Sequence, residues 1–305
     1  MLTSSLNPLD VKIFRGYVKR MGWKMYFPFT PGYDFAGVIV AIDHSGTPDN
    51  TERFSVGDEV CGVNFGDGTH DEESGHIAGA FAEYMIVAVS KLSRKPTSVT
   101  FEAAAALPLA GLTAYQVINR CAALSSSSTV LILGGPTSVG VLAIQLAKAK
   151  GAWVAVTSSS RNIEFVKSFG PDLVINYEQG EKEGKPWETH LQLRSLDVVV
   201  DVVGEINGFK RVKENNVVKE DGVFVALSSF DVGSDPRGHP PMKWCAKFGF
   251  SQNKADLDVL LSMVANGSLL VPVSEVFHFT NDGVREMFRK VETKSSRGKN
   301  VLKVH

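Results

Sequence analysis

A glycine-rich turn, Gly134 to Gly140, joins an apolar run at residues 130–133 to an amphipathic segment at 141–148. This order predicts a strand, a tight turn and a helix whose first backbone N–H groups and positive end attract a phosphate. Gly135 suits the tight turn, whereas small hydroxyl side chains stand where a middle glycine is usual. Those side chains still let the backbone approach a phosphate, and they add O–H donors. The predicted dinucleotide-binding residues of the turn are Gly135, Thr137, Ser138, Val139 and Gly140.

The end of the next predicted strand, at residues 153–157, indicates which dinucleotide binds. A site for NAD places Asp or Glu at this position, where the carboxylate accepts hydrogen bonds from the adenosine ribose. Here Ser158, Ser159 and Arg161 follow the strand, and no carboxylate occurs before Glu164. Hydroxyl groups and a guanidinium favour the extra 2′-phosphate of NADPH. The alternatives are a turn without any ligand and, for Arg161, an exposed cation in the first turn of a helix.

Size, charge and cysteine content restrict the class of protein. The chain of 305 residues is long enough for two domains, and its formal net charge of −1 argues against a nucleic-acid or polybasic membrane partner. Three cysteines, far apart in sequence, predict neither a disulfide framework nor a zinc ribbon. The uncharged segment 122–147 is long enough to cross a membrane, but Pro136 argues against a single spanning helix. Since no signal peptide is visible, we expect a cytoplasmic protein.

The order of the predicted elements indicates an α/β fold. Residues 31–90 are rich in strand-like runs, one of them at 80–89, and strands alternate with helices beyond them. This alternation predicts a parallel sheet with helices on both faces. The run at 198–203 is apolar throughout, as expected of a strand that is covered on both sides. Two further strand-like runs, at 271–279 and 300–304, lie near the end of the chain.

Several further motifs carry a resemblance to a known family. They lie at residues 5–16 (SLNPLDVKIFRG), 31–37 (PGYDFAG), 56–60 with 79–84 (VGDEV and GAFAEY), 107–115 (LPLAGLTAY) and 297–302 (RGKNVL). Together with the glycine-rich turn, they resemble the medium-chain dehydrogenase/reductase superfamily, in its zinc-independent quinone oxidoreductase-like branch. The resemblance extends along nearly the whole chain.

This resemblance implies a Rossmann domain, a doubly wound parallel sheet, inserted into a GroES-like β-rich catalytic domain. The implied catalytic domain comprises residues 1–98 and 270–305, and the implied Rossmann domain comprises residues 99–269. NADPH is expected between them, with Thr113 near the nicotinamide and Tyr177 beside the adenosine 2′-phosphate. A partly buried aromatic residue at a strand end is the alternative for Tyr177. Since the branch often dimerises through the Rossmann sheet edge, a homodimer is also expected.

Zinc-dependent relatives supply Cys, His and Glu ligands near two of these motifs. In this chain Tyr33 stands where the His would be, and residues 7–10 contain no Cys. Tetrahedral zinc sites need such nitrogen or sulfur ligands, so we expect no metal site. Hydride transfer then depends on orientation and on hydrogen bonds that polarise the acceptor.

The resemblance therefore implies an NADPH-dependent oxidoreductase that reduces quinones or activated alkenes by hydride transfer. Asn7 and Asp10 are expected at the cleft entrance, with Asn7 polarising a carbonyl or ordering a water; Tyr17 or Tyr33 is a candidate proton donor. An enoyl thioester reductase is an alternative if a basic groove binds coenzyme A or a carrier. The cations of that groove, which would otherwise face solvent, are Lys12, Arg15, Lys19 and Arg20. A non-catalytic NADPH-binding or partner-binding relative is the third possibility.

The start of the chain departs from the family pattern. Family members carry further strands before the motif that begins at Ser5, whereas this sequence begins at Met1. Edge strands of the catalytic domain are therefore expected to be missing, which leaves backbone groups unpaired and predicts, as an alternative, a truncated, inactive chain. If a preceding segment carries a transit peptide, a mitochondrial location is expected instead.

Overall fold

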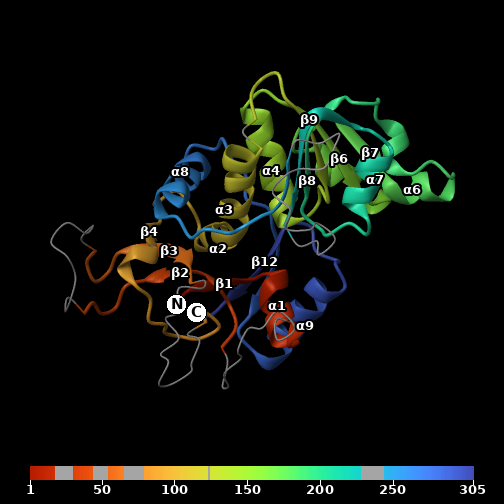
Figure 1. Cartoon of the computed structure of the whole chain (residues 1–305). Helices are drawn as coiled ribbons and strands as arrows, with labels where there is room; N and C mark the ends of the chain where they lie inside the picture. The colour runs from red at the N-terminus through yellow and green to blue at the C-terminus, as the bar shows by residue number, and fades with distance from the viewer. Residues whose placement is uncertain (18–29, 44–53, 65–78, 123, 228–243) are drawn as a thin grey trace. The chain divides into compact units, whose positions relative to one another are not determined.

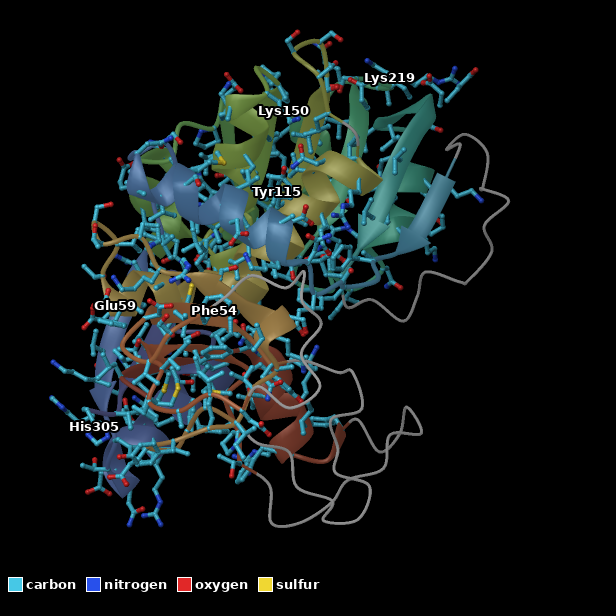
Figure 2. All side chains as sticks on the ribbon, turned by 90° about the vertical axis from the view of Figure 1, so that its left-hand side faces the viewer. Phe54, Glu59, Tyr115, Lys150, Lys219 and His305 are labelled. Carbon is cyan, nitrogen blue, oxygen red and sulfur yellow. The ribbon has the colours of Figure 1, made fainter. Side chains whose placement is uncertain are left out.

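The computed structural model describes residues 1–17, 30–43, 54–64, 79–122, 124–227 and 244–305. The chain forms two compact units, and each is described by itself. The first unit comprises Met1–Leu112 and Gln252–His305, and the second comprises Thr113–Ser251. Figure 2 labels Phe54 and Glu59 in the first unit and Lys219 in the second.

The second unit is built on a six-stranded sheet in which all neighbouring strands that the structure describes are parallel. The strands are β5 (Thr129–Leu133), β6 (Trp153–Ser158), β7 (Leu173–Asn176), β8 (Leu196–Asp201), β9 (Val218–Ala226) and β10 (Trp244–Lys247). Their order, β10-β9-β8-β5-β6-β7, makes the connections run in opposite directions from the β8/β5 pair. This is the order of a doubly wound Rossmann sheet, which binds ligands at the carboxyl ends of the strands beside that reversal. The predicted parallel α/β arrangement is confirmed (Figure 1).

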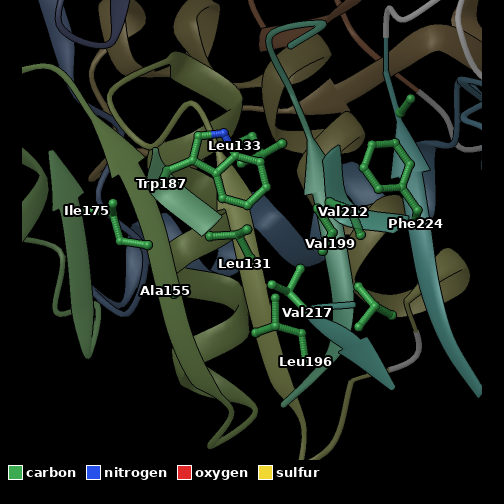
Figure 3. Close-up of a cluster of buried hydrophobic side chains, with 12 residues drawn as sticks. Leu131, Leu133, Ala155, Ile175, Trp187, Leu196, Val199, Val212, Val217 and Phe224 are labelled. Atoms are coloured by element: carbon green, nitrogen blue, oxygen red, sulfur yellow. The ribbon is translucent and has the colours of Figure 1, made fainter. Parts of the chain in front are cut away.

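Helices cover both faces of this sheet (Figure 1). They are α4 (Ser138–Ala149), α5 (Ile163–Lys167), α6 (Tyr177–Lys182), α7 (Gly208–Glu214) and, at the start of the unit, the end of α3 (Pro108–Gln116). Along β5, Leu131 and Leu133 belong to a buried cluster that includes Trp187 and Val212 (Figure 3). Alternate residues of a strand point to opposite faces, so the equally buried Ile132 packs on the other face. Burial on both faces explains why the sequence of this strand is apolar.

The first unit contains a second six-stranded sheet, in the order β11-β12-β1-β2-β3-β4. Its strands are β1 (Thr3–Leu6), β2 (Asp34–Val38), β3 (Glu59–Val63), β4 (Leu92–Arg94), β11 (Val273–His278) and β12 (Lys299–Lys303). β1 is antiparallel to both β12 and β2, and Thr3 lies opposite Lys303. Strands from the two ends of the sequence therefore lie side by side in one sheet.

Four helices pack on this second sheet and on each other: α1 (Pro8–Phe14), α2 (Phe101–Ala106), α8 (Lys254–Ala265) and α9 (Asn281–Glu292). α2 contacts β1, β2 and β12, and α8 contacts β4, so both helices belong to the first unit by their contacts. The sequence-based domain limits, residues 98 and 270, placed both helices in the Rossmann segment. The alanines of α2 are buried at Ala104, Ala105 and Ala106, since small side chains allow the helix to lie close to the strands.

Residues 80–89 do not form the strand that their sequence predicts. The backbone N–H groups of Ala80 and Phe81 donate to the carbonyls of Gly32 and Pro31, at 2.8 and 3.0 Å. Beyond Phe81, none of the described strands pairs with the segment. A strand forms only where a neighbouring backbone satisfies its N–H and C=O groups, so an alternating sequence alone does not produce one.

The uncharged segment 122–147 is divided between several elements. Its apolar parts form β5 and α4, and Pro136 lies in the turn between them. In the part of the chain that the structure describes, no helix is long and apolar enough to cross a membrane.

Candidate functional site

The turn between β5 and α4 is held by hydrogen bonds to the neighbouring strand. The N–H of Gly134 donates to Thr157 Oγ1 and the N–H of Gly135 donates to the Thr157 carbonyl, both at 3.0 Å. Thr137 is the N-cap of α4: its hydroxyl donates to the Gly134 carbonyl at 2.9 Å and accepts the N–H of Gly140 at 3.0 Å. The expected O–H donor of Thr137 is therefore occupied within the turn, which corrects the role assigned to that hydroxyl.

The first turn of α4 retains the features of an anion site. An N-cap satisfies only part of the free N–H groups at a helix start. Because Thr137 engages Gly140, the first-turn amides of Ser138 and Val139, which have no partner within the helix, are the ones that could bind an anion. Backbone amides and the positive helix end together suit a pyrophosphate.

Close approach of the backbone requires one glycine of the turn, Gly140, and leaves little room for a side chain at a second, Gly135. A Cβ atom added at Gly140 would lie 2.3 Å from the carbonyl oxygen of Gly134, which no real Cβ contact allows. A Cβ atom at Gly135 would lie 3.1 Å from Val156 Cβ, a tight contact with the neighbouring strand. The absence of a side chain at Gly140 therefore allows the first turn of α4 to lie close to the end of β5. This close contact is the steric reason for a glycine at position 140.

The predicted 2′-phosphate residues converge at the carboxyl end of β6. Ser158 is fully buried and donates its hydroxyl to the Ser159 carbonyl at 3.1 Å. Ser159 accepts a hydrogen bond from Asn162 Nδ2 at 3.1 Å and is also hydrogen-bonded to the Tyr177 side chain. Burial, followed by the charge of a neighbouring carboxylate, raises the pKa of Tyr177. Arg161 is exposed, and its charge acts on Tyr177.

A carboxylate that the sequence analysis missed lies at the same place. Glu178, in the first turn of α6, accepts the N–H of Ser160 through Oε2 at 2.9 Å. The nearest carboxylate that follows β6 directly in the sequence is Glu164, whereas Glu178 follows β7. The signal that could have found Glu178 is the parallel pairing of β6 with β7, in which Ser158 lies level with Asn176. Residues that follow the two strands must then meet.

In the first unit, a buried polar network surrounds Asp34. Its Oδ2 accepts Asn7 Nδ2 and Lys299 Nζ, both at 2.9 Å, and Ser5 Oγ at 3.1 Å, while Oδ1 accepts the N–H of Leu109 at 2.7 Å. Lys299 Nζ also donates to the side-chain oxygen of Asn7. Asn7 is 4% exposed, and its amide is bonded at both ends. The structure thus uses Asn7 to connect strands from both chain ends, not to present a free amide at an entrance.

Asp10 and Tyr33 lie beside this network. Asp10 is fully buried and accepts the N–H groups of Asn7 at 2.8 Å and Gly32 at 2.9 Å, so it fixes the start of α1. Burial raises the pKa of Asp10 to about 6. Tyr33 is 5% exposed, and burial together with the charge of Asp10 raises the pKa of its phenol. Tyr33 is therefore protonated throughout the neutral range.

The remaining predicted site residues are placed separately. Tyr17 is 55% exposed just after α1, and the structure does not bring it into the Asp34 network. Thr113 lies in α3, in the second unit, and is almost buried. Its place beside the nicotinamide stays a prediction.

The basic groove proposed for a thioester substrate is only partly described. Arg15 is paired with Glu292 at 2.6 Å, and its guanidinium also lies over the Phe14 ring. Lys12 is an exposed residue of α1, and desolvation of its ammonium group followed by the charge of Lys294 lowers its pKa. Lys19 and Arg20 lie outside the described residues. Among described residues, no group of three or more His, Cys, Asp or Glu side chains is arranged to hold a metal ion.

Two family descriptions match the chain: the alcohol dehydrogenase GroES-like domain over residues 1–97 and the zinc-binding dehydrogenase over residues 138–243. The 2-methylene-furan-3-one reductase of Solanum lycopersicum is 34% identical over an alignment of 306 positions, which covers 99% of this chain and 70% of that protein. The chloroplastic NADPH-dependent alkenal/one oxidoreductase of Arabidopsis thaliana is 34% identical over 304 residues, with coverages of 99% and 70%.

Solved structures give the same assignment. The quinone oxidoreductase from Coxiella burnetii superposes with a TM-score of 0.80 and 28% identity, covering 99% of this chain and 88% of that one. A doubly wound sheet with a glycine-rich turn and a separate GroES-like unit defines the class of two-part dinucleotide oxidoreductases. The chain belongs to the medium-chain dehydrogenase/reductase superfamily, in its quinone oxidoreductase-like branch, which confirms the resemblance found in the sequence.

Proposed function

We propose that the chain is an NADPH-dependent reductase of quinones or of alkenes conjugated to a carbonyl. The observation that supports this proposal most directly is the β5–α4 turn. In this turn Gly140 leaves no room for a Cβ atom, and the amides of Ser138 and Val139 lie at the start of α4. Relatives named as an alkenal/one oxidoreductase, a furanone reductase and quinone oxidoreductases support the substrate class.

The residues of the second unit fit NADPH by their chemistry. The first turn of α4 would hold the pyrophosphate, and Ser159, Arg161 and Tyr177 would hold the adenosine 2′-phosphate. When bound, NADPH supplies the hydride. The chain's own part is to bind and orient the two reactants and to exclude water from them.

The proton that completes the reduction of an alkene comes from a separate donor. Tyr33 is our candidate, because burial and the charge of Asp10 keep its phenol protonated at neutral pH. Asp10 and Asn7 act as positioning residues that fix α1 beside Tyr33. The homodimer and the compartment stay predictions.

Substrate turnover by the purified chain tests this function. With NADPH present, we expect oxidation of the reduced nicotinamide on addition of a short enone or a quinone. A matching enoyl coenzyme A thioester is expected to react more slowly, and a faster reaction with it would select the thioester reductase instead. Binding of NADPH without turnover of any of the three acceptors would select a non-catalytic NADPH-binding protein.

Replacement of Arg161 tests the 2′-phosphate assignment. Because hydrogen bonds to charged groups contribute about 1.5–3 kcal/mol, we expect Arg161→Ala to weaken NADPH binding by about tenfold or more and to leave NADH binding nearly unchanged. Lys167→Ala is the matched control, since Lys167 is an exposed cation of α5 paired with Glu164. Equal losses for both nucleotides in Arg161→Ala contradict the assignment.

A further inference from the structure

The carboxylate of Glu178 occupies a backbone donor, the Ser160 N–H, beside the residues that we assign to the 2′-phosphate. β6 and β7 are parallel neighbours, and Ser158 lies opposite Asn176. The segments that leave these strands, Ser159–Arg161 and Tyr177–Glu178, therefore meet at the same edge of the sheet. There the Ser160 N–H donates to Glu178 Oε2 at 2.9 Å.

Asn176 fixes this meeting point from both sides. Its Oδ1 accepts the N–H of Gln179 at 3.3 Å and so caps α6, which places Glu178 in the first helical turn. Its Nδ2 donates to Ser160 Oγ at 3.0 Å. The position of Glu178 opposite the Ser160 amide is thus built by the strand register and the cap, not by a chance contact between exposed side chains.

Glu178 is ionised and belongs to the same electrostatic group as Arg161. The hydrogen bonds from Ser160 lower its pKa, and the charges of Lys182 and Arg161 lower it further. Arg161 also acts on Tyr177, whose side chain is bonded to Ser159. Two of the residues that we assign to the 2′-phosphate, Arg161 and Tyr177, therefore interact with a negative charge that the chain itself supplies.

We propose that Glu178 is a specificity-determining residue that competes with the 2′-phosphate of NADPH for the Ser160 amide and for Arg161. The inference rests on the proposed function, because it concerns the same nucleotide site. To admit the phosphate, the carboxylate must leave the Ser160 amide, and it then stays near a group of the same sign. NADH carries no 2′-phosphate and meets no such repulsion. Glu178 thus weakens the preference for NADPH that Ser159, Arg161 and Tyr177 create.

Calorimetric titration of Glu178→Gln with NADPH and with NADH tests the inference. A carboxylate and a doubly charged phosphate about 5 Å apart in a water-like medium repel enough to change affinity about tenfold, so NADPH binding should tighten by about tenfold. NADH binding should change by less than about twofold. Gln keeps the length of the side chain and the start of α6, and a thermal unfolding curve checks the fold.

Glu181→Gln is the matched control, because it removes the same charge from an exposed position of α6. Equal tightening of NADPH binding in both variants overturns the inference, since net charge alone would then explain it. Weaker NADH binding in Glu178→Gln also overturns it, because Glu178 would then accept a ribose hydroxyl. Failure of the proposed function is distinguishable: the folded wild-type chain would bind neither nucleotide, or would bind NADPH without oxidising it on addition of any acceptor.

Discussion

At the residue scale, the buried ion pair of Lys299 with Asp34 is the clearest determinant of stability in the first unit. Both side chains are almost fully buried, and Asn7 bonds to each of them. Removing one partner of a buried pair leaves a charge without compensation, which destabilises by about 3–5 kcal/mol. We expect Lys299→Met to lower the free energy of unfolding by that amount in urea titrations.

The control for this prediction lies on the same strand. Lys303 is exposed near the end of β12, so Lys303→Met should change stability by less than about 0.5 kcal/mol. Similar losses in the two variants would mean that the Asp34 network contributes little to stability.

Asp10 predicts a pH dependence of stability at the same scale. Its pKa is raised from 3.8 to about 6 by burial, so the folded chain holds a proton that the unfolded chain has released. The contribution of Asp10 to the free energy of unfolding therefore declines as the pH rises from about 3.8 to about 6, and it is constant above pH 6. The total loss is about 3 kcal/mol. Unfolding free energies measured across this range should show that decline for the wild type relative to Asp10→Asn.

A matched substitution separates this effect from general titration. Asp282→Asn replaces an exposed carboxylate in the first turn of α9, and it should keep the pH profile of the wild type. A wild-type profile that stays parallel to that of Asp10→Asn contradicts a raised pKa.

At the element scale, the β5–α4 turn is the feature least tolerant of substitution. In Gly140→Ala the new Cβ atom would lie 2.3 Å from the Gly134 carbonyl oxygen, so α4 must shift. Overpacking of this kind typically destabilises by about 1–3 kcal/mol, and the displaced amides should also weaken NADPH binding. Gly249→Ala is the control, since its Cβ atom meets nothing within 4 Å. Unfolding curves and NADPH titrations compare the two variants. Equal stability and equal NADPH affinity of Gly140→Ala and Gly249→Ala would rule out the steric role of Gly140.

The sequence predicts three neighbouring strands of the second unit well for a physical reason. β5, β6 and β7 are short apolar runs bounded by Gly, Pro or Ser, and both their existence and their type are encoded locally. The segment 80–89 has an equally regular pattern, but a strand also requires a neighbouring backbone, which a local pattern does not report.

In the candidate site too, residues adjacent in the sequence were predicted, whereas residues brought together only by the fold were not. The hydroxyls and Arg161 after β6 were found because they follow the strand directly in the sequence. Glu178 was missed because it reaches Ser160 only through the β6/β7 register. The bonding of Asn7 to Lys299 joins residues 292 positions apart, so no local pattern indicates that this amide is occupied.

At the scale of the whole molecule, nucleotide binding should be visible as thermal stabilisation. A ligand that binds only the folded chain, present at about one hundred times its Kd, stabilises by about 2.7 kcal/mol. We expect NADPH to raise the unfolding temperature more than NADH does at the same concentration, because the 2′-phosphate contacts add affinity. Differential scanning fluorimetry measures both shifts. If NADPH and NADH raise the unfolding temperature of the wild type equally, and Arg161→Ala shows the same two increases, the assignment of Arg161 to the 2′-phosphate is contradicted.

The pairing of β1 with β12 has a consequence for synthesis on the ribosome. Since β1 lies between β12 and β2, the sheet of the first unit is completed only after the last strand, Lys299–Lys303, has been translated. All six strands of the inserted Rossmann unit, from β5 to β10, have by then left the exit tunnel. Long-range pairing of this kind forms slowly. We therefore expect the Rossmann unit of the nascent chain to fold before β1 pairs with β12.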